Sequence, residues 1–136
     1  MSSIHKFEDI QGWQEARKLS KALYQQTQSG RFSKDWGLID QVQRAGVSVM
    51  TNIVEGFDSG SNLEFVRFLN YARRSASEIQ SLLYVALDQS YIPQSVFQEL
   101  YEQAEKVRRL VTSFRQYLRK TRQRTNAPTR QRIVDS

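Results

Sequence analysis

The sequence contains no cysteine and a single histidine, His5, near the start of the chain. The lack of cysteine excludes disulfides, thiolate catalysis and zinc or iron–sulfur sites built on cysteine ligands. A carboxylate-bridged di-iron bundle needs Glu-x-x-His on two helices, so the single histidine excludes that class as well. The sequence also lacks a Gly-rich phosphate loop, a nucleophile elbow and a His-Glu-x-x-His motif. We therefore expect a protein that is not an enzyme and holds no metal or other cofactor.

Long apolar runs are also missing. No stretch approaches the ~20 apolar residues of a membrane span, and the first residues lack the basic-then-apolar form of a signal peptide. We therefore expect a cytoplasmic protein with no membrane partner. Apolar residues still make up 39% of the 136 residues and aromatic residues 11%, which is enough for one packed core.

Proline and glycine are scarce, with two and six copies, and they fall between long segments that show helical spacing of apolar residues. The predicted helices cover about residues 8–28, 34–55, 61–89 and 95–122. Strand-like alternation is absent, so the sequence predicts an all-α fold, an up-down-up-down antiparallel four-helix bundle. We expect residues 1–122 to form this domain and residues 123–136 to form a basic, mobile C-terminal tail.

The boundaries of these helices carry local signals. Ser33 and Asp35 are both candidate caps for the second helix. Ser61 and Ser95 each begin a segment with capping-box form, which places the starts of the third and fourth helices. Gly56 suits the left-handed position that follows a helix, and is expected to end the second one.

The net charge of +6 is unevenly distributed. The two signs balance over residues 1–114, whereas residues 115–136 hold only Asp135 against seven basic residues, namely Arg115, Arg119, Lys120, Arg122, Arg124, Arg130 and Arg132. A basic region of this kind attracts polyanions through phosphate neutralisation and counterion release. A solubilising helix end is the alternative interpretation.

Basic residues also align along the last predicted helix. Arg108, Arg115, Arg119 and Arg122 fall on one flank, and an aligned row can follow a nucleic-acid backbone where scattered charges cannot.

The third helix offers a second, weaker row. Arg67 and Arg74 flank Tyr71 on its outer face, where guanidinium groups can contact phosphate and the ring can stack on a base. An ion pair between Arg74 and Glu78 is the alternative. The candidate nucleic-acid-binding residues are therefore Arg67, Arg74, Arg108, Arg115, Arg119, Lys120, Arg122 and Arg124.

The second helix has more apolar surface than one bundle needs. Its core stripe is Leu38, Val42, Ala45, Val49 and Ile53. Further apolar residues widen the arc to about half the circumference, against the roughly 100° that packing in one bundle requires. The excess, together with the small residues Ala45 and Gly46 that permit close helix approach, predicts a subunit interface that includes Val47, Met50 and Val54. A tighter helix crossing within the monomer is the alternative.

The polar side of the same helix carries a ladder of adjoining side chains, Gln41, Arg44, Ser48, Asn52 and Glu55. We interpret it as a hydrogen-bonded seam, with Asn52 and Glu55 holding the turn at Gly56 and the cap at Ser61. A catalytic constellation is the alternative, but it would lack a His or Cys to act as base or nucleophile.

Several segments resemble one known family. They are Phe7-Glu8-Asp9-Ile10, Trp13-Gln14-Glu15-Ala16, the run from Leu38 to Val49, Asn52-Ile53-Val54-Glu55-Gly56, Glu64-Phe65, Phe68-Leu69, Ala72, Ser75, Glu78 and Tyr91-Ile92. Together they resemble the bacterial four-helix-bundle family encoded in intervening sequences of large-subunit ribosomal RNA genes. The likeness covers residues 7 to about 118. Its signature positions are Ser48, Asn52, Glu55 and Gly56, and Val54 replaces the family's usual alanine.

That family is similar to the accessory variability determinants of diversity-generating retroelements, which are homopentamers with a basic surface that bind a reverse transcriptase and RNA. The resemblance thus implies a homopentamer with RNA or DNA and a reverse transcriptase as partners. It carries no catalytic residue, because the motif defines none.

Three functions remain open from the sequence. The first is a non-enzymatic, homo-oligomeric nucleic-acid-binding accessory protein that partners a reverse transcriptase. The second is an oligomeric protein-interaction scaffold encoded in a ribosomal RNA intervening sequence. The third, a metal-dependent hydrolase or nuclease, would use Glu55, Glu64 and Glu78.

Overall fold

The computed structural model describes residues 4–125, with side chains through residue 121, and consists of four long helices. These are α1 (Gln11–Thr27), α2 (Trp36–Asp58), α3 (Asn62–Asp88) and α4 (Gln94–Thr125). Two 3-10 turns, η1 (Phe7–Asp9) and η2 (Gly30–Lys34), precede α1 and α2. Residues 4–125 contain no strand, so the predicted all-α class is confirmed. The predicted tail, residues 123–136, lies almost entirely outside the described residues.

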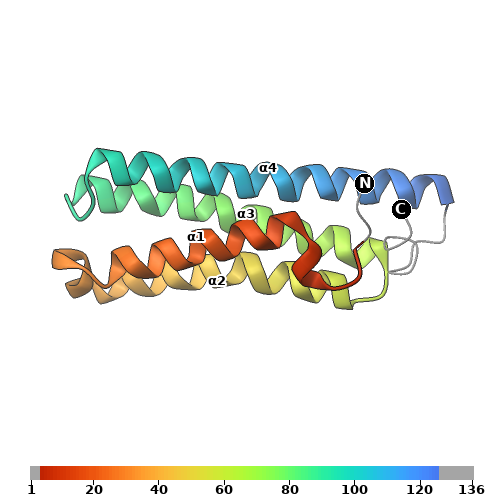
Figure 1. The fold of residues 1–136 in the computed structure, drawn as a ribbon, viewed down its shortest axis with the longest axis horizontal. Helices are drawn as coiled ribbons and strands as arrows, with labels where there is room; N and C mark the ends of the chain where they lie inside the picture. The colour runs from red at the N-terminus through yellow and green to blue at the C-terminus, as the bar shows by residue number, and fades with distance from the viewer. Residues whose placement is uncertain (1–3, 126–136) are drawn as a thin grey trace.

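Successive helices run in opposite directions, as the colour order in Figure 1 shows. Each helix contacts two neighbours: α1 packs against α2 and α4, and α3 packs against the same two helices. This is the ring of antiparallel neighbours that short connections require. At one end of the bundle α4 extends past the other helices (Figure 1), so its last turns have no helix beside them.

The core is formed by the apolar stripes of all four helices. The stripe predicted for α2 is buried along its length, and Val49 and Ile53 are completely inaccessible. Leu19 of α1, Leu69 of α3 and Val107 of α4 are equally inaccessible. A stripe at 3.6-residue spacing on each helix is therefore sufficient to account for the core.

Local signals fix two of the helix starts. The Leu38 amide donates to the side chain of Asp35 at 3.1 Å, so Asp35 rather than Ser33 caps α2. The Glu64 amide donates to Ser61 Oγ at 3.2 Å, as the capping pattern predicts.

The predicted start of α4 is wrong by a small margin. The helix begins at Gln94, directly after Pro93, whose carbonyl accepts the Phe97 amide at 3.0 Å. Ser95 therefore lies inside the first turn and not at the cap. Proline has a fixed φ that is compatible with a helix start and has no amide hydrogen to leave unpaired, so it suits this place.

The predicted end of α2 at Gly56 is also wrong. The helix continues to Asp58, and Gly56 is buried within it. A Cβ added at Gly56 would lie 2.7 Å from Phe65 Cδ1 and 3.0 Å from Phe68 Cβ. Glycine is required there because α2 approaches α3 closely, and the left-handed turn position is Gly60, with φ of 79°.

A polar contact joins α1 to α4 through Glu15, which is almost fully buried. Its carboxylate accepts a hydrogen bond from Gln103 Nε2 at 3.1 Å and pairs with Lys18 and Lys106. The Gln103 hydrogen bond, followed by the two lysines, lowers the pKa of Glu15 to about 2 despite its burial. Its contribution to stability is therefore present above the ordinary pKa of 4.5 and is lost as the pH falls towards 2.

We predict opposite effects for two glycine substitutions in α2. Gly56→Ala should lower the free energy of unfolding by ~1–3 kcal/mol, because its methyl group overlaps Phe65 and Phe68. Gly37→Ala is the control: Gly37 is exposed in the first turn, and alanine there should add ~0.5–1 kcal/mol. Denaturant unfolding at one fixed protein concentration measures both, and a neutral Gly56→Ala would contradict the close contact.

Candidate nucleic-acid interface

The arginine row of α4 lies on the flank that faces α3. Arg108, Arg115 and Arg119 share this flank because they are seven and four residues apart. These spacings are close to two turns and one turn of an α-helix. One contact crosses the seam directly: Arg115 Nε donates to the Val66 carbonyl of α3 at 3.3 Å. Arg108 and Arg115 are thus half-buried along the α3–α4 seam, whereas Arg119 is exposed.

Arg108 is neutralised by a carboxylate. Its Nε and Nη2 donate to the two oxygens of Glu105 at 3.0 and 2.9 Å. Gln80 Nε2 of α3 donates to the same carboxylate at 3.0 Å. The Arg108 hydrogen bonds, and then that of Gln80, lower the pKa of Glu105 to about 2. This charge is therefore engaged within the seam and is a poor candidate for contact with a phosphate.

Arg115 has a different environment. It is half-buried, and it has no carboxylate partner among the described side chains. Burial, and then the nearby charges of Arg119 and Arg73, lower the pKa of its guanidinium. Arg73 of α3 donates its Nε and Nη2 to the neutral Asn70 Oδ1, at 3.2 and 2.8 Å. We call Arg73, Arg115 and Arg119 the arginine cluster.

Arg73 was not among the candidates from the sequence, which favoured its neighbour Arg74. One residue along a helix is a rotation of 100°, so Arg73 lies on the flank towards α4 while Arg74 points outward. Only the position of α4 shows which of the two joins Arg115.

The predicted row on the outer face of α3 is partly engaged. Arg67 Nε donates to the Tyr71 hydroxyl at 3.0 Å, its guanidinium lies 5.9 Å from the Tyr71 ring centroid, and it pairs with Glu64 at 3.4 Å. The Tyr71 ring is therefore covered by Arg67. Arg74 is exposed and forms no ion pair with Glu78 within the described residues.

The remaining basic candidates belong to the last turns of α4. Lys120 is exposed. Arg122 and Arg124 belong to the helical backbone, but their side chains lie outside the described residues, as do Arg130 and Arg132.

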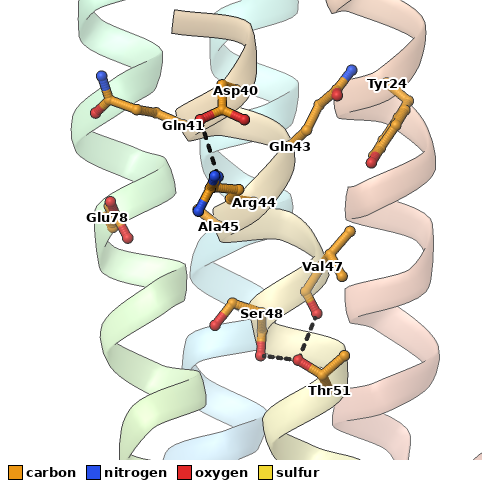
Figure 2. Close-up of a pocket in the computed structure, with 10 residues that line it drawn as sticks. All are labelled: Tyr24, Asp40, Gln41, Gln43, Arg44, Ala45, Val47, Ser48, Thr51 and Glu78. Atoms are coloured by element: carbon orange, nitrogen blue, oxygen red, sulfur yellow. Dashed lines mark hydrogen bonds and ion pairs between the residues drawn. The ribbon is translucent and has the colours of Figure 1, made fainter. Parts of the chain in front are cut away.

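An open groove of about 670 Å³ lies over the outer face of α2. Figure 2 shows α2 in front, with Tyr24 of α1 on one side and Glu78 of α3 on the other. Along α2, Arg44 Nε pairs with Asp40 at 3.0 Å, and the Thr51 hydroxyl donates to the carbonyls of the preceding turn. The groove is thus formed largely by side chains whose polar groups are already paired.

The apolar residues predicted for a subunit interface divide into two groups. Gly46 is covered within the monomer, because a Cβ there would lie 3.2 Å from Leu23 Cδ1 of α1. Met50 is half-buried and packs against the core. Val47 is 40% exposed and Val54 is half-buried without core contacts, so these two form the free part of the arc.

The signature positions Ser48 and Asn52 form a seam between α2 and α3. Ser48 Oγ lies 2.9 Å from Ser75 Oγ, and Asn52 Nδ2 donates to the Ser48 carbonyl and hydroxyl at 2.8 and 3.0 Å. The hydrogen-bonded interpretation of the ladder is thus supported at these two residues. The predicted role of Asn52 and Glu55 at the turn is wrong, since Asn52 bonds one turn back and Glu55 is exposed.

Ser59 holds that turn instead. Its hydroxyl donates to the Gly56 carbonyl at 2.7 Å and to the Ser61 carbonyl at 3.2 Å. The Glu55 carboxylate makes no hydrogen bond or ion pair with the described residues.

No group of three His, Asp or Glu side chains within the described part of the chain lies close enough to hold a metal ion. Glu55, Glu64 and Glu78, considered above as ligands, therefore do not form such a group. None of the helices among these residues is long and apolar enough to cross a membrane.

Comparison with solved structures identifies the class of fold. A crystal structure of a protein of unknown function from the S23 ribosomal protein family of Bacteroides thetaiotaomicron superposes with a TM-score of 0.71. The match has 19% sequence identity and covers 77% of this chain and 95% of the other. This protein is therefore a four-helix bundle of the same fold.

The family follows from the sequence itself. The family model of the 23S rRNA-intervening sequence protein matches residues 8–113, and the chain belongs to this family. The family predicted from the sequence motifs is thus confirmed. No curated protein matches the chain.

We predict different effects for two neighbouring signature residues. Asn52→Ala should lower the free energy of unfolding by ~1 kcal/mol, because it removes two half-buried hydrogen bonds to Ser48. Glu55→Ala, the control one turn along the same helix, should change it by less than about 0.5 kcal/mol. Thermal or denaturant unfolding tests both, and an equal loss in the two variants would show that Glu55 has a partner elsewhere in the assembly.

Proposed function

We propose that this member of the 23S rRNA-intervening sequence protein family is a non-enzymatic, homo-oligomeric accessory protein that binds nucleic acid. The observation that carries the proposal is the arginine cluster. A half-buried guanidinium without a carboxylate partner is costly, because its charge is partly removed from water with no countercharge. Three arginines that share a seam and lack a carboxylate are well suited to an anionic partner.

Nucleic acid is the anion that best fits the distribution of charge. Two of its three arginines are on α4, and the unbalanced basic residues of the sequence begin at Arg115 and continue past Lys120. A row of this length can contact successive phosphates of one backbone, and such contacts carry little sequence information. We therefore propose RNA or DNA binding with weak dependence on sequence.

The oligomer is proposed on separate grounds. Val47 and Val54 leave apolar surface on the outer face of α2, and Met50 lies between them. A contiguous apolar strip on a helix favours burial against another subunit. The resemblance to accessory variability determinants supports five copies per assembly, and it supports a reverse transcriptase as the protein partner.

The oligomer proposal predicts a mass well above 15.9 kDa by light scattering, near fivefold for a pentamer. Val54→Asp should release folded monomers, because a charge buried against an apolar partner is strongly disfavoured. Ser81→Asp, which adds the same charge at an exposed position of α3, should leave the mass unchanged. A monomeric wild type would contradict the proposed interface.

The binding proposal predicts a steep dependence on salt. The logarithm of affinity for single-stranded RNA should fall with the logarithm of salt concentration by roughly 0.7 per phosphate contacted, and by roughly 0.9 for duplex DNA. Arg115→Glu with Arg119→Glu should reduce both the affinity and this slope. Fluorescence anisotropy at several salt concentrations measures both quantities.

The matched control for that experiment is Arg17→Glu with Lys21→Glu, because it makes the same change of charge on the exposed face of α1. It should preserve most of the affinity. If wild type binds neither RNA nor DNA at low salt, nucleic-acid binding is rejected, and an oligomeric protein-interaction scaffold becomes the favoured function.

A further inference from the structure

The arginine cluster has free hydrogen-bond donors as well as uncompensated charge. Arg115 uses Nε on the Val66 carbonyl, and its two terminal nitrogens have no acceptor among the described residues. Arg73 uses Nε and Nη2 on Asn70 and retains Nη1. Arg119 is exposed and unpaired within the same part of the chain. A planar guanidinium with free terminal nitrogens matches two oxygens of one phosphate group.

A second, independent feature marks the same place. The Thr112 hydroxyl is inaccessible to solvent and has no hydrogen-bond partner. Thr112 lies one turn before Arg115 on the flank that faces α3. Such an orphaned hydroxyl is uncommon in folded proteins, and it leaves this level of the α3–α4 seam with an unsatisfied polar group.

The register of the seam aligns Thr112 with the cluster. Gln80 of α3 bonds Glu105 of α4. Because the two helices are antiparallel, a step of seven residues forward on α4 and seven back on α3 brings Thr112 level with Arg73. The orphaned hydroxyl is therefore level with Arg73 and one turn before Arg115.

We propose that Arg73, Arg115 and Arg119 form a discrete site for one phosphate group of a nucleic-acid backbone. This inference rests on the proposed function and deepens it. A general basic surface needs only positive charge, and lysine serves as well as arginine. A discrete site depends on the fork of the guanidinium, so lysine cannot replace Arg115 there.

The site has a cost in the free protein. Arg115 is partly removed from water and lies near two like charges, both of which disfavour its charged form. A bound phosphate supplies the missing countercharge and the missing acceptors. Removal of the Arg115 charge should therefore leave the free protein as stable or more stable while abolishing the site. If Arg115 instead served only to hold α4 to α3 through the Val66 carbonyl, removal of its side chain would make the free protein less stable.

Thermal unfolding of the full-length protein in inorganic phosphate, against chloride of equal ionic strength, tests the site. The variants are Arg115→Lys, Arg115→Gln and the exposed control Arg17→Gln. Phosphate stabilises most proteins by exclusion from their surface, so only the excess over that shared shift counts. In wild type and Arg17→Gln, the unfolding midpoint should rise beyond that shared shift, and this additional rise should grow with the logarithm of phosphate concentration. Both Arg115 variants should lack the additional rise.

Two results of this experiment would overturn the site. One is an equal phosphate-dependent shift in all four proteins. The other is a midpoint in chloride that is lower for Arg115→Gln than for wild type, which would make Arg115 a structural tie.

Binding of an oligonucleotide without terminal phosphates identifies the source of the phosphate. Arg115→Lys should weaken its binding on the order of tenfold, as expected for loss of a charge-assisted bond. If phosphate stabilises wild type but the oligonucleotide binds both proteins equally, the site takes free or terminal phosphate and the backbone assignment fails. A third outcome separates this inference from the proposed function. If the oligonucleotide binds wild type and all Arg115 variants equally, and phosphate raises the unfolding midpoint of all of them equally, then nucleic-acid binding stands and the discrete site is rejected.

Discussion

The close approach of α2 to α3 at Gly56 is the constraint on which the rest of the bundle depends. With no side chain at this position, the rings of Phe65 and Phe68 pack directly against the α2 backbone. Two turns earlier along α2, the same short separation allows the small Ser48 side chain to reach Ser75. A larger residue at Gly56 would separate the helices and break that hydrogen bond. The seam therefore sets both the spacing and the rotation of α3, and through them the flank that α3 presents to α4.

The two flanks of α3 have different chemistry. Towards α2, the polar contacts are neutral and satisfied, as at Ser48 and Ser75. Towards α4, Gln80, Glu105 and Arg108 form a satisfied charged group, but the following turns bring Arg73 to Arg115 without a carboxylate. The contacts on the α2 flank stabilise the fold. On the α4 flank, the uncompensated positive charges of Arg73 and Arg115 lower its stability. Natural proteins commonly give up stability where a ligand is bound, because the groups that recognise it are left unsatisfied in its absence.

The elements that could be predicted from the sequence are those governed by local chemistry. Buried stripes follow from helical spacing, and Ser61 caps α3 because its hydroxyl and the Glu64 amide are three residues apart. Gly56 was misassigned because its role depends on two rings of another helix, which no local pattern reveals. Arg73 was missed for the same reason. Glu55 was misassigned because adjacency on a helical wheel does not show whether a partner exists across the turn.

Arg108 and Arg115 show why a row of charges on one helix does not by itself define a binding surface. Both lie on the same flank of α4, one is seven residues from the other, and both belong to the predicted row. Arg108 meets a carboxylate that α3 also holds through Gln80, and its charge is neutralised. Arg115 meets a backbone carbonyl, and α3 adds Arg73, another positive charge. The difference lies in the neighbours of each arginine: Glu105 of the same helix neutralises Arg108, whereas Arg73 of α3 adds a positive charge near Arg115. Because the seam that fixes the fold and the cluster that remains unsatisfied occupy opposite flanks of α3, substitutions at the exposed ends of the cluster side chains should act on binding with little effect on the α2–α3 packing.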